Sequence, residues 1–122
     1  MTDPVAIADR YIAAWNETEP KRRRALIDDL WTEDARFRDP VMQGDGPAGI
    51  DAMIEGVQNR FPGFRFQLIG QPDGFGDYVR LSWGLGPDGP ESAPLKGTDF
   101  VEVTEGRLKA VTGFFDQLPP QS

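Results

Sequence analysis

The sequence predicts an α+β fold in which three N-terminal helices lie over one face of a curved antiparallel sheet. Apolar residues recur at helical spacing up to residue 61, and apolar and polar residues alternate after residue 63. Stretches rich in glycine and proline separate the later segments, as expected for turns between strands. Because 122 residues can bury one core but not two, we expect one domain over residues 1–122.

The first predicted helix begins at Asp3 and Pro4, a pair typical of a helix start. Its residues at a spacing of four form a buried stripe of Ile7, Tyr11 and Trp15. The second predicted helix has Thr18 as its cap and Pro20 in its first turn. We expect its buried side to consist of Leu26, Ile27, Leu30 and Trp31. The basic run at residues 21–24 is then a solvent-exposed face of this helix.

A strand that contains Phe37 comes next, and Pro47 opens a third predicted helix that ends in the sequence RFPGF. The apolar face of this helix consists of Ile50, Met53, Ile54, Val57 and Phe61.

Strands are predicted for the rest of the chain. Residues 71–77 are interpreted as a turn that leads into the strand YVRLSWGL, and residues 86–94 as a loop rich in helix and strand breakers. Two closing strands, residues 95–104 and 107–115, are joined by a tight turn at Glu105-Gly106.

One carboxylate is predicted to lie on a buried strand face. Side chains alternate along a strand, so in the stretch ending FRDPV Asp39 shares its face with Ala35 and Phe37. A carboxylate among apolar neighbours is costly unless it is protonated, paired or hydrogen-bonded, and desolvation raises its pKa. An Asp-Pro pair is also a common turn start, so the alternative interpretation of Asp39 is a structural acceptor for backbone N–H groups.

A second carboxylate, Asp99, and a tyrosine, Tyr11, also allow both a structural and a functional interpretation. Asp99 shares a strand face with Gly97 and Val101, and two buried acids on different strands indicate a pocket between sheet and helices. Tyr11 belongs to the buried stripe of the first helix, where core packing alone explains its ring, but its hydroxyl needs a partner. If that hydroxyl reaches Asp99, the pair can donate hydrogen bonds to a carbonyl oxygen. Asp39, at a strand exit, is expected to be ionised at neutral pH, and Asp99, in mid-strand, to be protonated.

Composition restricts the partners and the chemistry. The formal net charge of −7 disfavours nucleic acids and anionic membranes as partners. No apolar stretch approaches the roughly 20 residues of a membrane span, and no signal peptide is visible, so we expect a cytoplasmic protein. The chain has no cysteine and no histidine, so we expect no metal and no organic cofactor. Its chemistry must then use carboxylates, tyrosine, amines or hydroxyls.

The segments RYIAAWN, LWTEDARFRDPV, GPAGI and GTDFVEVTEGRLKAVTGFFD, in this order, resemble the nuclear transport factor 2-like superfamily. This superfamily includes the ketosteroid isomerases and the SnoaL-like polyketide cyclases. The resemblance runs nearly end to end and implies a cone-shaped, cystatin-like α+β roll. In such a roll a strongly bent antiparallel sheet wraps around three helices and encloses an apolar cavity. Because this architecture hosts many unrelated activities, the fold alone does not decide the function.

The ketosteroid isomerase pattern can be carried over residue by residue. The resemblance implies that Tyr11 is an oxyanion-hole tyrosine, that Asp39 in its Asp-Pro-Val segment is the general base, and that Asp99 is the protonated acid. The loop at residues 86–94 and the ending TGFFDQLPP resemble the SnoaL-like branch more than a steroid isomerase.

Three classes of function remain open. The protein is an enzyme that isomerises a double bond or cyclises a polyketide-like substrate, a noncatalytic receptor for a small apolar ligand, or an interaction module. We expect the walls of a ligand cavity to contain Trp15, Phe37, Ile54, Val57, Phe66, Trp83 and Phe114. The outer face of the sheet is expected to mediate a homodimer through Tyr78, Phe100, Val111 and Phe115.

Overall fold

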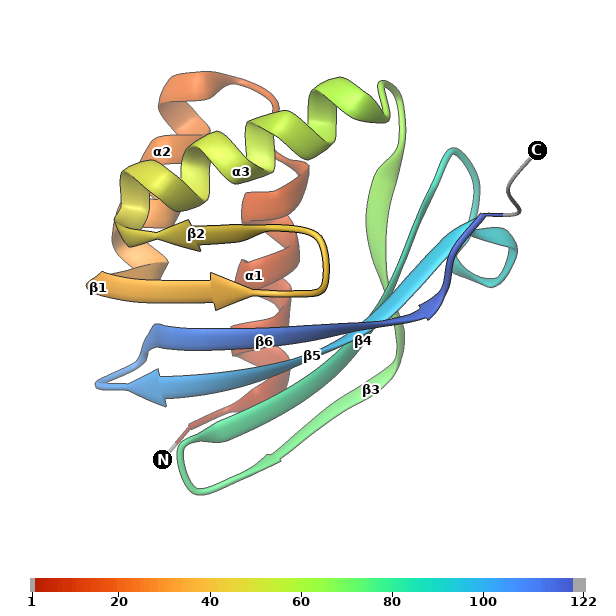
Figure 1. Ribbon diagram of the computed structural model, residues 1–122. Helices are drawn as coiled ribbons and strands as arrows, with labels where there is room; N and C mark the ends of the chain where they lie inside the picture. The colour runs from red at the N-terminus through yellow and green to blue at the C-terminus, as the bar shows by residue number, and fades with distance from the viewer. Residues whose placement is uncertain (1, 120–122) are drawn as a thin grey trace.

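The computed structural model describes residues 2–119, and within them it confirms the α+β fold class (Figure 1). Three helices pack against a strongly curved sheet of six strands that does not close on itself. The helices are α1 (Pro4–Asn16), α2 (Pro20–Leu30) and α3 (Gly46–Arg60). The strands are β1 (Trp31–Arg38), β2 (Gln43–Asp45), β3 (Arg65–Phe75), β4 (Tyr78–Gly86), β5 (Leu95–Thr104) and β6 (Arg107–Gln117). A short 3₁₀ helix, η1 (Pro90–Ser92), lies in the loop between β4 and β5.

The strand order is β2-β1-β6-β5-β4-β3. Strands β3 to β6 follow one another as antiparallel neighbours, whereas β1 and β6 run parallel, so the sheet is mixed rather than wholly antiparallel. The alternation of apolar and polar residues does not encode strand direction, so the parallel pair is not predictable from it. The short strand β2, which pairs with β1, was also not predicted.

The caps of the first two helices follow from their prolines. The Asp3 carboxylate accepts hydrogen bonds from the backbone N–H groups of Val5 and Ala6, as predicted for the start of α1. In α2 the cap is Glu19 rather than Thr18. Proline at the first helical position places the cap directly before it, and the Glu19 carboxylate accepts from the Arg22 N–H at 2.8 Å.

The prediction of an exposed basic run in α2 is wrong for Arg23, whose side chain is buried. Its guanidinium donates to Asp51 at 2.6 Å, to Glu55 at 3.0 Å and to Gln58 at 2.9 Å. These three acceptors lie on α3, so Arg23 connects the two helices. Leu26, which was predicted to be buried, is 38% exposed instead.

Strand β3 extends through the stretch that was interpreted as a turn. It continues to Phe75 with an irregular register between Ile69 and Asp73, and the turn itself is at Gly76-Asp77. The closing strands and the turn at Glu105-Gly106 lie where they were predicted, and β6 is two residues longer.

A bulge in β6 reverses the predicted orientation of its second half. Leu108 pairs with Val103 and Ala110 pairs with Glu102, which leaves Lys109 as an extra residue in β6. Leu108 faces the core, and after the bulge the inward positions are Val111, Gly113 and Phe115. Val111 is therefore buried and not on the outer face. Phe114 points outward and is 55% exposed, so it does not line a cavity.

No helix among residues 2–119 is long and apolar enough to cross a membrane.

Candidate functional site

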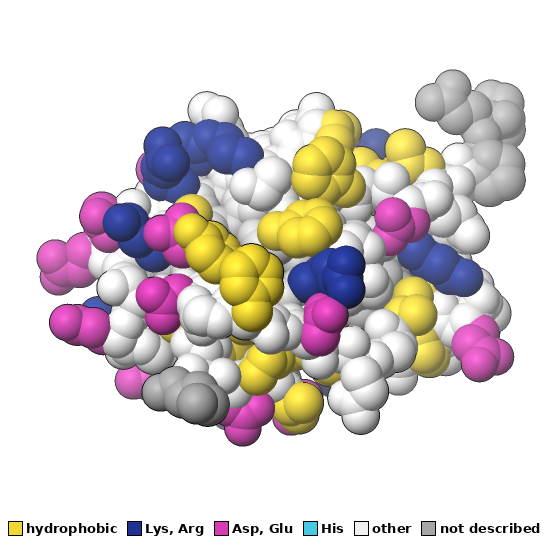
Figure 2. Space-filling view, turned by 90° about the horizontal axis from the view of Figure 1, so that it is seen from below, with side chains coloured by type: hydrophobic (Ala, Val, Ile, Leu, Met, Phe, Trp, Pro, Cys, Tyr) yellow, Lys and Arg dark blue, Asp and Glu magenta, His cyan; other side chains and the backbone are white. Residues whose placement is uncertain are grey.

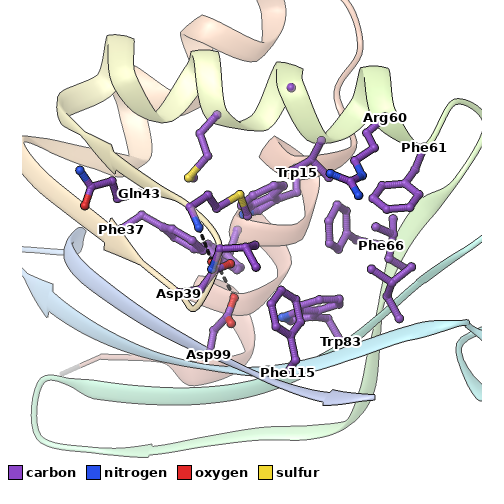
Figure 3. Close-up of a pocket in the computed structure, with 18 of the residues that line it drawn as sticks. Trp15, Phe37, Asp39, Gln43, Arg60, Phe61, Phe66, Trp83, Asp99 and Phe115 are labelled. Atoms are coloured by element: carbon purple, nitrogen blue, oxygen red, sulfur yellow. Dashed lines mark hydrogen bonds between the residues drawn. The ribbon is translucent and has the colours of Figure 1, made fainter. Parts of the chain in front are cut away.

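A cavity of about 850 Å³ lies between α1, α3 and the concave face of the sheet (Figure 3). Its walls are mainly apolar, and it is open to solvent where the exposed side chains of Val41 and Leu118 form its rim. Of the residues predicted from sequence, the following line it: Tyr11, Trp15, Phe37, Asp39, Val57, Phe66, Trp83 and Asp99.

Two predicted wall residues are elsewhere. Phe114 is on the outer face because of the bulge in β6, and its neighbour Phe115 lines the cavity in its place. Ile54 is fully buried in the core, because on α3 the cavity-facing stripe passes through Met53 and Val57 and leaves Ile54 beside it.

The cavity has polar groups besides the predicted tyrosine and the two predicted aspartates. Gln43 from β2 and Arg60 from the end of α3 also line it. A helical spacing signal could have found Arg60, since it lies one turn beyond Val57 and Gly56 on the same face of α3.

Tyr11 and Asp99 meet at the inner end of the cavity. The Tyr11 hydroxyl donates a hydrogen bond to Asp99 Oδ2 at 2.7 Å, although the two residues are 88 positions apart. Both side chains are buried, with 1% and 4% of their surface exposed. Tyr11 arrives on the buried stripe of α1, and Asp99 lies on the buried face of β5, in agreement with the alternation of that strand.

Burial dominates the protonation of this pair. Desolvation raises the pKa of Asp99 to about 6, although the hydrogen bond from Tyr11 and the nearby Trp83 indole lower it. The negative charge of Asp39 raises it further. Burial therefore moves the titration of Asp99 from the usual range of a carboxyl group toward neutral pH. The direction of this shift is the one predicted for a carboxylate in mid-strand, and the Tyr11 hydroxyl and the Trp83 indole oppose it. The pKa of Tyr11 is raised well above its usual value by burial and by Asp99, so Tyr11 stays a hydrogen-bond donor.

Asp39 lies directly after β1, half-buried at the cavity wall. Its Oδ1 accepts hydrogen bonds from the backbone N–H groups of Val41 and Met42, each at 2.9 Å. These bonds fix the carboxylate in the turn that leads to β2. The structural interpretation of Asp39 as a backbone acceptor is therefore correct for one of its oxygens, and Oδ2 makes no hydrogen bond within residues 2–119.

Gly113 keeps the two acids close together. It pairs with Asp99 across β5 and β6. A Cβ atom at this position would lie 2.7 Å from Asp99 Oδ1 and 3.4 Å from the Asp39 Cβ. The absence of a side chain at Gly113 therefore leaves room for the Asp99 carboxylate, and Asp39 and Asp99 lie near each other in Figure 3.

Aromatic rings form a continuous wall around these polar groups. Trp15 contacts Phe37 and Phe66, with ring centroids 5.8 and 5.0 Å apart. Phe66 contacts Trp83 in turn at 5.3 Å, and Trp83 contacts Phe115 at 6.3 Å. Such a wall offers a large apolar surface to a ligand and lowers the local dielectric constant around the acids. Among residues 2–119, no group of three or more acidic side chains is arranged to bind a metal ion.

Comparisons with known proteins agree with this fold. The family model described as the SnoaL-like domain matches residues 8–111. A solved structure from Agrobacterium tumefaciens strain C58, provisionally named an isomerase of the SnoaL-like family, is 50% identical with a TM-score of 0.88. That match covers 95% of this chain and 99% of the other. No curated protein gives a match.

Two more distant structures share the fold. A protein from Kribbella flavida, provisionally named a ketosteroid isomerase, is 22% identical with a TM-score of 0.70, over 98% of this chain and 83% of that one. A protein from Sinorhizobium meliloti, provisionally named a polyketide cyclase, is 14% identical with a TM-score of 0.69, over 88% and 93% of the two chains. The match over residues 8–111 and the relative with 50% identity together show that the chain belongs to the SnoaL-like domain family, with the nuclear transport factor 2-like fold.

Proposed function

We propose that the protein catalyses proton transfer at the carbon next to the carbonyl group of an apolar compound, as a double-bond isomerase or an aldol-type cyclase. The observation that carries this proposal is the buried hydrogen bond between Tyr11 and Asp99, with Asp39 close by in the same apolar cavity. The name of the A. tumefaciens relative, an isomerase, supports the first of the two reactions.

In the proposed reaction Asp39 is the base. Its carboxylate removes a proton from the carbon next to the carbonyl group, and the electron pair of that C–H bond moves to the carbonyl oxygen to form an enolate. Tyr11 and the protonated form of Asp99 donate hydrogen bonds to this oxygen. An isomerase then returns the proton to a different carbon, whereas in a cyclase the enolate carbon attacks a second carbonyl group of the same molecule.

The protonation of Asp99 fits this role when a ligand is bound. An apolar ligand that excludes water from the cavity increases the desolvation of Asp99 and raises its pKa beyond the value in the free protein. Asp99 then carries a proton at neutral pH and can donate it in a hydrogen bond. Proton transfer of this kind uses side chains alone and needs neither a metal nor an organic cofactor.

Noncatalytic binding of a small apolar ligand is the alternative, and one observation favours it. Tyr11, Asp99 and one oxygen of Asp39 have partners without a ligand, because Asp39 Oδ1 accepts two backbone hydrogen bonds and Tyr11 donates to Asp99. In that case the acids orient a ligand and transfer no proton.

Isomerisation of a β,γ-unsaturated ketosteroid tests the proposal, because the conjugated ketone that forms absorbs in the ultraviolet. We expect conversion by the wild-type protein and a loss of about 10²- to 10⁴-fold in Asp39→Asn, the range typical of removing a general base. The affinity of Asp39→Asn for the same ketone, measured by quenching of tryptophan fluorescence, should differ from that of the wild-type protein by less than about twofold. Asparagine preserves the shape of the side chain, so only the proton transfer is lost.

Asp88→Asn is the matched control, because Asp88 is an exposed acid in the loop between β4 and β5. It should convert the ketone at the wild-type rate. Binding without conversion by the wild-type protein, over a panel of β,γ-unsaturated ketones, would favour the noncatalytic alternative.

A further inference from the structure

We infer that Arg60 forms an anion-binding subsite in the cavity, and that the ligand is an amphiphilic oxo-acid with an apolar body, a carbonyl group at one end and a carboxylate at the other. This inference rests on the proposed function for the position of the carbonyl group. Beyond the proposed function, it assigns a carboxylate to the other end of the ligand and names Arg60 as the residue that binds this carboxylate.

Arg60 is the cationic side chain among the residues that line the cavity. It is the last residue of α3. Figure 3 shows it extending toward the cavity on the side of Phe61 and Phe66, away from Asp39 and Asp99. The cavity therefore has its hydrogen-bond donors and acids at one end, a cation at the other and an aromatic wall between them.

Within the part of the chain that the structure describes, most of the arginines have polar partners, whereas the arginine in the cavity wall does not. Six of the ten arginines in the chain form ion pairs with acidic side chains: Arg10, Arg22, Arg23, Arg24, Arg38 and Arg80. Arg107 donates to the backbone carbonyls of Asp28 and Trp31. Within residues 2–119, Arg36, Arg60 and Arg65 form no ion pair, and of these three Arg60 is the one that lines the cavity. Its guanidinium lies against the ring of Phe61, 5.8 Å from the ring centroid.

This arrangement suits a carboxylate. A guanidinium presents a planar pair of N–H donors that matches a carboxylate, and stacking on an aromatic ring holds the donors in place. Arg60 is an exposed residue at the edge of the cavity, so solvent partly screens its charge, and the apolar wall beside it strengthens the attraction for a carboxylate only on the cavity side. A net charge of −7 repels anionic ligands at long range, so a local cation is needed to bind an acid at this site.

The test measures the binding of synthetic aryl ketones by isothermal titration calorimetry. The probes are ω-(2-naphthyl)-ω-oxoalkanoates of increasing chain length and the corresponding primary amides, which have nearly the same shape without the charge. We expect the wild-type protein to bind at least one acid about threefold or more tightly than its amide, the range of an ion pair with an exposed arginine. Arg60→Gln should remove most of this preference and leave the affinity for the amide within about twofold. Added salt should weaken the binding of the acid and not of the amide.

Arg65→Gln is the control, because it removes the same charge from an exposed arginine on β3 that does not line the cavity. It should leave the preference for the acid intact. Equal affinity of the wild-type protein for acid and amide, or an equal effect of Arg65→Gln, would overturn the anion subsite.

The same experiment separates this inference from the proposed function. A preference for the acid that depends on Arg60, together with unchanged binding of every probe in Tyr11→Phe, supports the subsite and contradicts the placement of the carbonyl group at Tyr11. If Tyr11→Phe binds both probes more weakly and the wild-type protein shows no preference for the acid, the result supports the placement of the carbonyl group at Tyr11 and contradicts the anion subsite. Failure of every probe to bind the wild-type protein would contradict both.

Discussion

At the scale of single residues, Asp99 is the side chain at which burial and hydrogen bonding oppose each other. Burial favours its neutral form, and the Tyr11 hydroxyl favours its carboxylate. Carboxyl-carbon NMR of the free protein should give a titration midpoint near pH 6 for Asp99. Tyr11→Phe should move this midpoint upward, because it removes a donor to the ionised form. A midpoint near 4 in both proteins would mean that water reaches Asp99 freely.

The raised pKa of Asp99 also predicts how stability depends on pH. The folded protein holds this proton more tightly than the unfolded chain, so its contribution to stability is present below about pH 4 and is lost as the pH rises through 6. A rise in pKa from 3.8 to about 6 corresponds to about 3 kcal/mol, at about 1.36 kcal/mol per pKa unit.

Asp99→Asn removes this titration. The free energy of unfolding of each protein is measured in urea at pH 4 and at pH 7. Between these two pH values, the difference between variant and wild type should change by about 3 kcal/mol in favour of the variant. Comparing the two proteins cancels the contributions of the other acids. The same difference at both pH values would show that Asp99 has the same pKa in the folded and unfolded states.

Periodicity identifies Tyr11, Asp39 and Asp99 as separate candidates, and only the resemblance to the ketosteroid isomerases assigns them to one site. Helical and strand periodicity gave each of them a buried or half-buried position. The hydrogen bond between Tyr11 and Asp99 depends on how α1 packs against the sheet, and no local pattern encodes that packing. Arg60 was missed because an arginine at the end of a helix has an ordinary explanation in the helix dipole.

At the scale of elements, Arg23 tests how α2 is attached to α3. Arg23→Met keeps the apolar part of the side chain and removes three hydrogen bonds to α3. We expect the free energy of unfolding to fall by about 2 kcal/mol, which is less than for a fully buried pair because Asp51 and Glu55 can reach water.

Arg24→Met is the matched control, because Arg24 is the exposed neighbour whose ion pair with Asp28 lies within α2. Its effect in the same urea titration should stay below about 1 kcal/mol. Similar losses in both variants would mean that the connection between the helices does not contribute to stability.

The bulge in β6 shows why periodicity predicts the strand but not which of its side chains face inward. A bulge adds one residue and reverses which side chains face inward, yet Lys109 has no local signal that distinguishes it from a regular strand residue. The helices and the strands β4 to β6 were predictable within a few residues, because their apolar patterns are long. Because Lys109 is the extra residue, Phe115 lines the cavity where Phe114 was predicted to do so.

At the scale of the whole molecule, the convex side of the sheet carries an aromatic patch. It consists of Phe75, Tyr78, Phe100 and Phe114, which are 45–79% exposed. Figure 2 shows hydrophobic side chains gathered on the face seen from below. The Phe100 and Phe114 rings pack edge to face, 5.9 Å apart. We propose that a second copy of the chain covers this patch, since two-fold pairing is the commonest way to bury such a surface.

Light scattering at micromolar concentration should give a mass of about twice 13.5 kDa. Phe114→Asp should give the monomer mass, because it places a charge within the proposed interface, beside Phe100. Leu26→Asp changes an exposed apolar residue on α2 and should leave the mass unchanged. A monomer mass for the wild-type protein would exclude this dimer at that concentration.

The curved α+β architecture could be predicted because its elements occur in a distinctive order along the whole chain. The parallel pairing of β1 with β6 could not, since it depends on where the chain returns to the sheet after α2. The cavity results from both features, because β1 supplies Phe37 and the turn with Asp39, whereas β5 and β6 supply Asp99 and Gly113.

Exchange of hydrogen for deuterium next to a carbonyl group tests the central claim most directly, because it reports the removal of the proton whatever product follows. The ω-(2-naphthyl)-ω-oxoalkanoates have such hydrogens, and proton NMR in D₂O follows their loss. We predict that the wild-type protein accelerates the exchange, that Asp88→Asn does the same, and that Asp39→Asn slows it by about 10²-fold or more while it still binds the ketone. Exchange at the uncatalysed rate with a wild-type protein that binds the ketone, or equal rates for wild type and Asp39→Asn, would contradict the account.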